Sequence, residues 1–196
     1  MVILEEIRLV HTFQGNDMKI VWLHIPQLEE RMIETKDFVF MLKDQGYEII
    51  DGITPKGIDF AIWKPLDAVW ESDDIIIIGQ DNVPTFKMIK ELEKCKHEAC
   101  VNPCISYPRS TALTGNYQNQ IVLTDDTTGQ RLLQVNERPE FVDYGGTGVC
   151  KISKKTQERI KLKEHPCSFP ALDSTLFQIG LKKWHTHYPM HKHNKM

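Results

Sequence analysis

The sequence predicts an α/β fold with a mostly parallel central sheet flanked by helices, and a smaller second half that contains a β-hairpin. Short β-branched and aromatic runs alternate with helical hydrophobic periodicity over the first half of the chain, which is typical of parallel strands joined by crossover helices. The segment Asp73–Ile78 ends in four isoleucines, as expected of an interior strand covered on both faces. Beyond Cys104 this alternation gives way to paired short β runs around a turn.

The first half of the chain predicts two more strands and two helices. Lys19–Ile25 reads as a buried first strand, and Tyr47–Ile50 as a second. Between them, apolar residues at helical spacing predict a helix that ends at Gly46. Pro84–Lys94 predicts a later helix with proline in its first turn. The expected buried residues are Leu28, Met32, Ile33, Val39 and Leu42 in the first helix, and Phe86, Ile89 and Leu92 in the second.

The second half predicts a hairpin, a glycine-rich loop and a last helix. Gln120–Leu123 and Gln130–Val135 flank the turn-rich segment Thr124–Gly129, which is typical of a hairpin. The loop spans Gly145–Gly148, a basic segment follows it, and the last helix is expected over Ser174–Lys183. We expect residues 1–196 to form one domain, because a chain of this size buries roughly 70% of its unfolded surface.

The composition is that of an ordinary globular protein, with 41% hydrophobic and 26% charged residues in a 196-residue chain. These values exclude disordered, collagenous and coiled-coil classes. The longest aliphatic run, Ile75–Ile78, is far shorter than the ~20 residues of a membrane helix. Glu5 and Glu6 stand where a secretory signal would carry basic residues. We therefore expect a cytoplasmic protein, in the host cytoplasm if it is viral.

Charge is distributed unevenly along the chain. Residues 1–149 hold 14 basic and 24 acidic side chains, whereas residues 150–196 hold 10 basic and 3 acidic ones. A basic carboxyl-terminal quarter predicts contact with an anionic group such as phosphate or an anionic lipid surface, although a solvated face gives the same composition. The acidic first 149 residues disfavour a nucleic-acid partner.

The five cysteines are an odd number, which favours a reducing compartment over a secreted disulfide framework. Cys95, Cys100 and Cys104, with His97 and His165, suggest a zinc site and with it a nucleic-acid-binding module. Their spacings do not match the two-residue knuckle of common zinc folds. We expect buried free thiols instead, with Cys95 on the apolar face of the helix before it.

Polar residues that follow the predicted strands are the first candidates for a site, because ligands of open α/β sheets bind at the carboxyl ends of the strands. These residues are His24, Asp51 and the segment Gly79–Asn82, in which Asp81 is the leading candidate. The alternative for Asp81 is a turn or helix-capping acid before Pro84. An acidic triplet precedes the same strand, so we expect it at the opposite edge as solvated surface: Glu71, Asp73 and Asp74.

Three segments in order resemble the GT-A fold glycosyltransferases of the inverting family 2 type. Ile75–Pro84 (IIIIGQDNVP), followed by a helix and a strand ending near Ser106–Pro108, is similar to the family's central strand and its aspartate motif. Gly145–Lys155 resembles the acceptor-side glycine loop and strand, and Ala171–Phe177 the acidic motif of the catalytic base. The chain's small size also resembles that of the small glycosyltransferases of crenarchaeal icosahedral viruses.

The resemblance implies a GT-A (nucleotide-diphospho-sugar transferase) fold and transfer of a sugar, with inversion, from a nucleotide-sugar donor to an acceptor hydroxyl. It implies a Mn²⁺ or Mg²⁺ cofactor held by Asp81 and by one histidine of the tail, for which His191 is preferred over His193 and His187. Asp173 would be the catalytic base, while an N-cap is the plain structural role for this residue.

The family also implies how the ligands are divided along the chain. Residues 19–108 would form the nucleotide-binding half, and residues 109–196 the acceptor side with the last helix and tail. The donor would be a UDP- or GDP-sugar, and the acceptor a glycoprotein or a glycolipid reached through peripheral membrane contact. The implied nucleotide contacts are His24, Pro26, Asp51, Gln80 and Asp81, and the implied acceptor loop is Gly146, Thr147 and Gly148. Trp63 and Lys64 are further nucleotide candidates, with the core as the alternative for Trp63.

The sequence departs from the family at position 79, where a full acidic motif carries a second aspartate and this chain has Gly79. The alternative function is therefore a degenerate GT-A-like protein that binds a nucleotide or a partner without turnover. A Rossmann dehydrogenase or methyltransferase is disfavoured, because no glycine turn follows the first strand. A sugar nucleotidyltransferase is disfavoured for the same reason.

Overall fold

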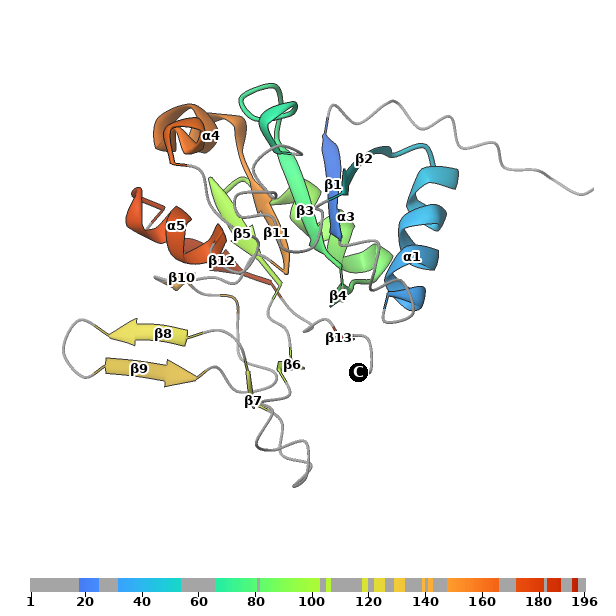
Figure 1. Ribbon diagram of the computed structural model, residues 1–196. Helices are drawn as coiled ribbons and strands as arrows, with labels where there is room; N and C mark the ends of the chain where they lie inside the picture. The colour runs from blue at the N-terminus through green and yellow to red at the C-terminus, as the bar shows by residue number, and fades with distance from the viewer. Residues whose placement is uncertain are drawn as a thin grey trace, which may run out of the picture.

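A seven-stranded mixed sheet forms the centre of the molecule (Figure 1). The computed structural model describes residues 18–24, 32–53, 66–80, 82–102, 105–106, 118–119, 122–125, 129–132, 139, 141–142, 148–165, 172–181, 183–187 and 192–193. The strand order is β2-β1-β3-β11-β5-β12-β10. The strands are β1 (Lys19–His24), β2 (Glu48–Ile53), β3 (Ile75–Gly79), β5 (Ala99–Val101), β10 (Phe141–Val142), β11 (Val149–Ile152) and β12 (Trp184–Thr186).

The sheet is mostly parallel, as the sequence predicted. β1 pairs in parallel with both β2 and β3, and β12 pairs in parallel with β5. β11 is antiparallel to β3 and β5, so it runs against the strands on either side of it, and β10 is antiparallel to β12 at the edge. All five residues of β3 are buried, which confirms that the isoleucine run is an interior strand.

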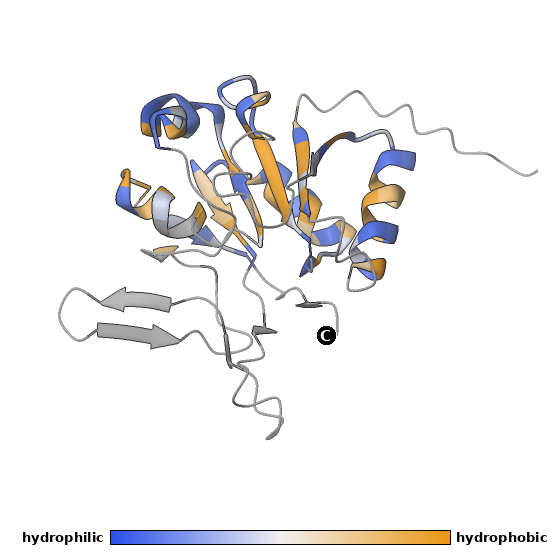
Figure 2. Ribbon diagram, in the orientation of Figure 1, coloured by the Kyte–Doolittle hydropathy of each residue, from blue (hydrophilic) through white to orange (hydrophobic). Residues whose placement is uncertain are grey.

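Helices cover both faces of this sheet. On one face, α1 (Ile33–Asp44) and α3 (Phe86–Lys94) pack against Ile20, Ile76 and Ile78. On the other face, α4 (Lys154–Ile160), the short 3-10 helix Leu162–Glu164 and α5 (Leu172–Gln178) join a second apolar cluster. Figure 2 shows hydrophobic residues along the central strands, while the helices carry both hydrophobic and hydrophilic residues. Among the described residues, no helix is long and apolar enough to cross a membrane.

Local sequence signals explain where the helices begin and end. Thr85 caps α3 by accepting a hydrogen bond from the Met88 N–H, and α1 is followed by Gly46 in the left-handed region. The prediction that Ile33 is buried is wrong, because its side chain is 59% exposed. Ile33 begins the helix two residues before Thr35, so it points away from the buried stripe. That stripe consists of Thr35, Phe38, Val39 and Leu42, while Leu28 lies outside the described residues.

Short strands complete the described part of the chain. β8 (Val122–Asp125) and β9 (Gly129–Leu132) pair antiparallel and confirm the predicted hairpin, while β6 (Ile105–Ser106) pairs with β7 (Gln118–Asn119). β4 (Asn82–Val83) pairs with β13 (Lys192–His193). The last helix ends five residues earlier than predicted, because the chain turns at Ile179–Gly180 and then continues into β12.

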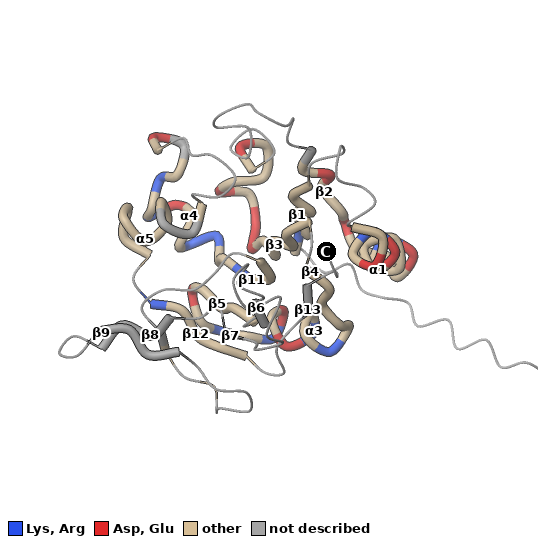
Figure 3. The backbone as a smooth tube through the Cα atoms, turned by 60° about the horizontal axis from the view of Figure 1, so that its bottom comes forward, with Lys and Arg blue, Asp and Glu red and all other residues tan. Residues whose placement is uncertain are grey.

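The acidic triplet lies at the amino end of β3, as predicted, but it is more than solvated surface. Asp74 Oδ1 accepts a hydrogen bond from the Lys154 N–H at 2.8 Å, and its Oδ2 lies 3.1 Å from Lys151 Nζ. Asp73 pairs with Lys19 at 3.1 Å. Figure 3 shows this acidic turn beside the basic segment that forms β11 and α4. Two of the three acids therefore serve the packing of β1, β11 and α4.

Candidate functional site

The carboxyl edge of the parallel strands gathers several of the residues singled out from the sequence. β1, β2 and β3 end there with His24, Asp51 and Gly79 in or near their last positions, and Gln80 follows Gly79. β11 begins at the same edge because it is antiparallel to β3. Gly79 N–H donates to the Gly148 carbonyl oxygen at 2.7 Å, which joins the two segments. The predicted site residues outside the described ones are Pro26, Asp81, Gly146, Thr147 and His191, as are Trp63 and Lys64.

His24 and Asp51 contact each other across neighbouring strands. The His24 Nε2 atom pairs with Asp51 Oδ1, and the imidazole ring stacks on Trp22 with centroids 3.9 Å apart. The His24 side chain is buried, whereas that of Asp51 is 59% exposed. A fixed histidine thus orients a carboxylate that faces solvent at the strand ends. An acid in this position is suited to accept hydrogen bonds from ribose hydroxyls.

Asn82 explains why position 79 is a glycine. Its side chain is buried between β3 and the start of β11. A Cβ on Gly79 would lie 2.5 Å from Asn82 Nδ2, and a Cβ on Gly148 would lie 2.5 Å from Asn82 Oδ1. The Asn82 carbonyl oxygen also accepts a hydrogen bond from Thr35 Oγ1 of α1 at 3.0 Å. The amide therefore takes the space that an aspartate side chain at position 79 would need.

The histidine-rich tail returns to the loop that follows β3. In the antiparallel pair of β4 and β13, Lys192 lies opposite Val83 and His193 opposite Asn82. Asn82 follows Asp81 in the sequence, and Asp81 itself lies outside the described residues. The sequence alone gives no reason for Asn82 and His193, 111 positions apart, to meet.

Asp173 is the second residue of α5 rather than the residue before the helix. The helix begins at Leu172, earlier than predicted, because Leu172 and Leu176 are both buried against the sheet. The predicted N-cap role of Asp173 is therefore wrong, since a cap residue precedes the first helical residue. The Asp173 side chain itself is outside the described ones.

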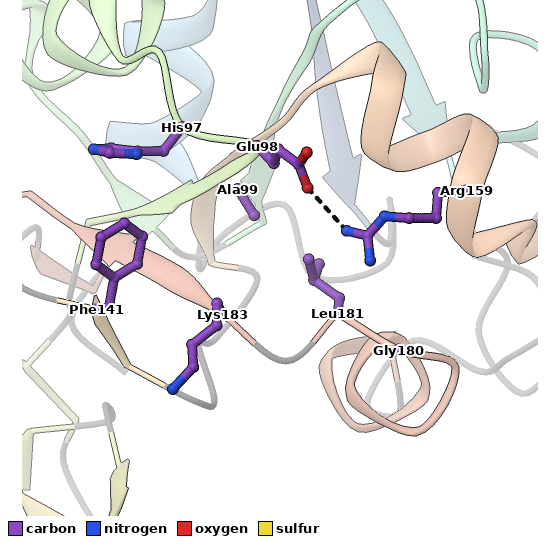
Figure 4. A pocket seen from close by; sticks show the side chains of 8 residues that line it. All are labelled: His97, Glu98, Ala99, Phe141, Arg159, Gly180, Leu181 and Lys183. Atoms are coloured by element: carbon purple, nitrogen blue, oxygen red, sulfur yellow. Dashed lines mark hydrogen bonds and ion pairs between the residues drawn. The ribbon is translucent and has the colours of Figure 1, made fainter.

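A cavity of about 330 Å³ opens at the opposite edge of the sheet (Figure 4). Within it, Glu98 pairs with Arg159 at 3.0 Å, and outside it Glu98 also pairs with Lys155 at 2.8 Å. The hydrogen bond from Lys155 lowers the pKa of Glu98 below its usual value, and Arg159 acts in the same direction. The lining residues are His97, Glu98, Ala99, Phe141, Arg159, Gly180, Leu181 and Lys183. Of these residues, His97 was considered from the sequence, as a potential zinc ligand.

A second group of potential ligands lies beside α3. The ligand atoms of Cys95, His185 and His187 are all within 4.8 Å of one another. Burial, together with the nearby His97 and His187, lowers the pKa of His185 to about 4. Burial also lowers the pKa of His187. Both imidazoles are therefore neutral near pH 7 and keep a lone pair for bonding.

Sequence reasoning named Cys95 and His187 as candidate ligands of two different metal sites, but it did not bring them together with His185, because β12 was not predicted. The overlooked signal is the pattern His185-Thr186-His187, which places both histidines on one face of a strand. The prediction of free thiols is wrong for Cys95 and Cys100, which are joined by a disulfide. Cys104, the third cysteine of that prediction, lies outside the described residues.

The fold and the carboxyl edge together define an α/β protein with an open, mostly parallel sheet and polar residues where such sheets bind ligands. No protein-family model matches this chain, and no curated protein matches it. Solved structures, in contrast, include chains of similar fold. The crystal structure of A197 from STIV is similar at 13% identity over 87% of this chain and 80% of that chain, with a TM-score of 0.48.

A Bacillus anthracis protein assigned as a glucose-1-phosphate thymidylyltransferase, solved in complex with a sucrose, is similar at 13% identity. The match covers 89% of this chain and 88% of that chain, with a TM-score of 0.44. At this level of similarity neither structure decides the function. The functional argument therefore rests on the residues of this chain.

Proposed function

We propose that this protein is a glycosyltransferase that moves a sugar from a UDP- or GDP-sugar to the hydroxyl group of a glycoprotein or glycolipid acceptor, with inversion. The observation that carries the proposal is the pairing of β13 with β4, in which His193 lies opposite Asn82. This pairing brings an imidazole-rich tail to the residue next to Asp81. A carboxylate and an imidazole are ligands that suit a divalent metal ion at a nucleotide site.

The nucleotide would lie across the ends of β1, β2 and β3. Asp51, held by His24, is placed to accept hydrogen bonds from the ribose, while Pro26 would shape the loop against the base. Gln80 follows the buried β3 strand and would contact the diphosphate. The glycines at 79 and 148 let the two backbones approach each other here, with a hydrogen bond of 2.7 Å between them.

Asp81 and a tail histidine, His191 or His193, would hold one Mn²⁺ or Mg²⁺ ion with few protein ligands. Imidazole favours Mn²⁺ over Mg²⁺. When bound, such an ion neutralises charge on the diphosphate leaving group. Because Asn82 occupies the space beside Gly79, no carboxylate at that position can assist.

Proton transfer and acceptor binding would fall to the second half of the chain. Asp173 in the first turn of α5 would take the proton from the acceptor hydroxyl as the hydroxyl oxygen attacks the anomeric carbon. The loop Gly146–Gly148 would line the acceptor side and leads directly into β11. The basic carboxyl-terminal quarter would attract an anionic lipid surface when the acceptor is a glycolipid.

A second candidate function is nucleotide binding without turnover. The specific observation in its favour is the packing of Asn82 against Gly79, which replaces the second acid of the family motif with a structural amide. The two functions make the same prediction for nucleotide affinity. They differ in whether the bond between sugar and diphosphate is broken.

Release of UDP or GDP from the corresponding nucleotide sugars in the presence of Mn²⁺ tests the proposal without a known acceptor, because water replaces the acceptor in slow turnover. We expect release by the wild-type chain, a loss of at least tenfold in Asp173→Asn, and unchanged donor affinity in that variant. The control is Asp37→Asn, an exposed acid on α1. Donor binding with no release in any condition would favour the binding-only function, and equal release by Asp173→Asn would exclude this base.

A further inference from the structure

We propose that Cys95, Cys100, His185 and His187 form a site for Zn²⁺ that is separate from the carboxyl-edge site. Cys95 follows the last residue of α3, Cys100 lies in β5, and the two histidines belong to or follow β12. All four are on the face of the sheet that α3 covers. The site does not depend on the proposed transfer activity.

The spacing of the two imidazoles matches zinc ligation. The His185 Nδ1 and His187 Nε2 atoms are 3.3 Å apart. Two imidazole nitrogens bound at about 2.0–2.1 Å to a tetrahedral zinc ion lie about 3.3 Å from each other. Alternation along β12 places both rings on the same side, and the Cys95 sulfur lies within 4.8 Å of both. Three soft or borderline ligands therefore already converge.

Cys100 supplies the fourth ligand. In the parallel pairing of β5 and β12, Cys100 is directly opposite His185, and its sulfur is bonded to that of Cys95. The two Cα atoms are 7.1 Å apart, whereas disulfide-bonded cysteines usually have Cα atoms about 4.4–6.8 Å apart. Two thiolates on one zinc ion have sulfurs about 3.8 Å apart, at Zn–S distances of about 2.3 Å. The wider backbone spacing suits thiolates that share an ion.

The surroundings favour a closed structural site. Cys95 and Cys100 are buried, and the rings of His97 and Phe141 pack on His185 with centroid distances of 4.2 and 5.3 Å. Two thiolates balance the charge of Zn²⁺, which lowers the desolvation cost of burying the ion. The ammonium group of Lys151 donates to the Cys95 carbonyl oxygen at 2.7 Å, which holds the backbone of Cys95 at the end of α3.

The disulfide and the zinc ion compete for the same two sulfurs. A phosphine reductant converts the disulfide into two thiols, while water supplies the two protons and the oxygen that turns the phosphine into its oxide. Binding of Zn²⁺ then displaces the two thiol protons to solvent. In the zinc form, one ion would join the end of α3 to β5 and β12. These two strands have three residues each, so they gain more from a cross-link than the longer central strands.

Titration of the phosphine-reduced full chain with Co²⁺, followed by displacement with Zn²⁺, tests the proposal. We expect one equivalent of Co²⁺ with thiolate charge-transfer and tetrahedral d–d absorption bands, and loss of both bands on adding Zn²⁺. The variants His185→Gln and His187→Gln should weaken Co²⁺ binding at least tenfold. The chain with both Cys95→Ser and Cys100→Ser should lose the charge-transfer band. The control His165→Gln, an exposed histidine after the 3-10 helix, should keep it.

Thermal unfolding separates loss of the site from loss of the fold. Zn²⁺ should raise the Tm of the reduced wild-type chain and of His165→Gln, but not that of His187→Gln, whose metal-free Tm should match the wild-type value. The proposal is overturned if the reduced chain gives no thiolate band, or if both histidine variants bind Co²⁺ as tightly as the wild type. Either result leaves the Mn²⁺ site at Asp81 untouched, because that site uses no thiolate.

Discussion

The Asn82 side chain packs directly against the Cα atom of Gly79 and leaves no room there for a side chain. A Cβ on residue 79 would lie 2.5 Å from the Asn82 amide nitrogen, a distance that real Cβ atoms do not tolerate. The same amide group blocks a side chain on Gly148. One buried amide therefore fixes the backbone of β3 and β11 at the edge where the proposed donor binds.

The substitution Gly79→Ala should destabilise the protein by about 1–3 kcal/mol, because the added methyl group overpacks against Asn82. Adding Asn82→Ala should remove most of the clash, giving a coupling energy of about 1 kcal/mol or more between the two sites. Chemical denaturation of the two single variants and the double variant measures this coupling. Gly52→Ala is the control. Its added Cβ would meet Leu23 and the Trp22 carbonyl oxygen rather than Asn82, so its effect should add to that of Asn82→Ala without coupling. Additive effects of Gly79→Ala and Asn82→Ala would contradict the packing argument.

The substitution Asp51→Ala should weaken nucleoside diphosphate binding by roughly tenfold, which is ~1.4 kcal/mol, with little change in Tm. The carboxylate is largely exposed, so its loss removes a ligand contact and little packing. Calorimetric titration with UDP and GDP measures the affinity. Glu48→Ala, an exposed acid on the same strand, should bind as the wild type does. If the two variants had equal affinities, Asp51 would have no part in the site.

The substitution Asp74→Ala should lower the free energy of unfolding by about 1–3 kcal/mol. It leaves the buried ammonium group of Lys151 without its carboxylate partner. It also removes the acceptor of the Lys154 N–H in the first turn of α4. Asp73→Ala is the matched control, and because the Lys19–Asp73 pair is more exposed, its loss should cost about 1 kcal/mol or less. Urea denaturation compares the two variants. A cost for Asp73→Ala equal to that for Asp74→Ala would count against a structural role for the Lys151 pair.

Stability should depend on the charge of Glu98 at mildly acidic pH. Lys155, through its hydrogen bond, lowers the pKa of Glu98 below 4.5, so the folded state favours the charged carboxylate more than the unfolded state does. The stabilisation is present above the unfolded pKa and is lost as the pH falls through the folded pKa. Glu98→Gln should therefore lower Tm at pH 7 and have a smaller effect below about pH 4.5. The exposed Glu164→Gln should show no such change, and a pH-independent effect of Glu98→Gln would exclude the linkage.

The sequence was most informative about the central parallel strands and the helices between them. The isoleucine run, the alternation of strands and helices, and the position of Gly46 each have a direct physical cause in burial or backbone conformation. The hairpin around residues 126–128 was equally clear from its turn residues. These features depend on neighbours in the sequence, so a single chain is enough to reveal them.

The sequence was least informative where distant segments meet. β12 was read as tail because its residues Trp184–Thr186 include a histidine and a threonine, and burial of Trp184 depends on α5 and the sheet. The return of β13 to β4, and the approach of His185 and His187 to Cys95, depend on that same strand. The sequence shows that residue 79 is a glycine where the motif has an aspartate, but it does not show why. The packing of Asn82 against Gly79 gives the reason.

Calorimetric titration with UDP, GDP and their sugars, with and without Mn²⁺, tests the central claim most directly when it is carried out on the wild-type chain, Asp81→Ala and the control Asp37→Asn. The account predicts binding of one nucleotide that strengthens at least tenfold with Mn²⁺, with that metal effect lost in Asp81→Ala and kept in Asp37→Asn. Absence of nucleotide binding by the wild-type chain in both metal conditions would contradict it, and so would an equal metal effect in Asp81→Ala.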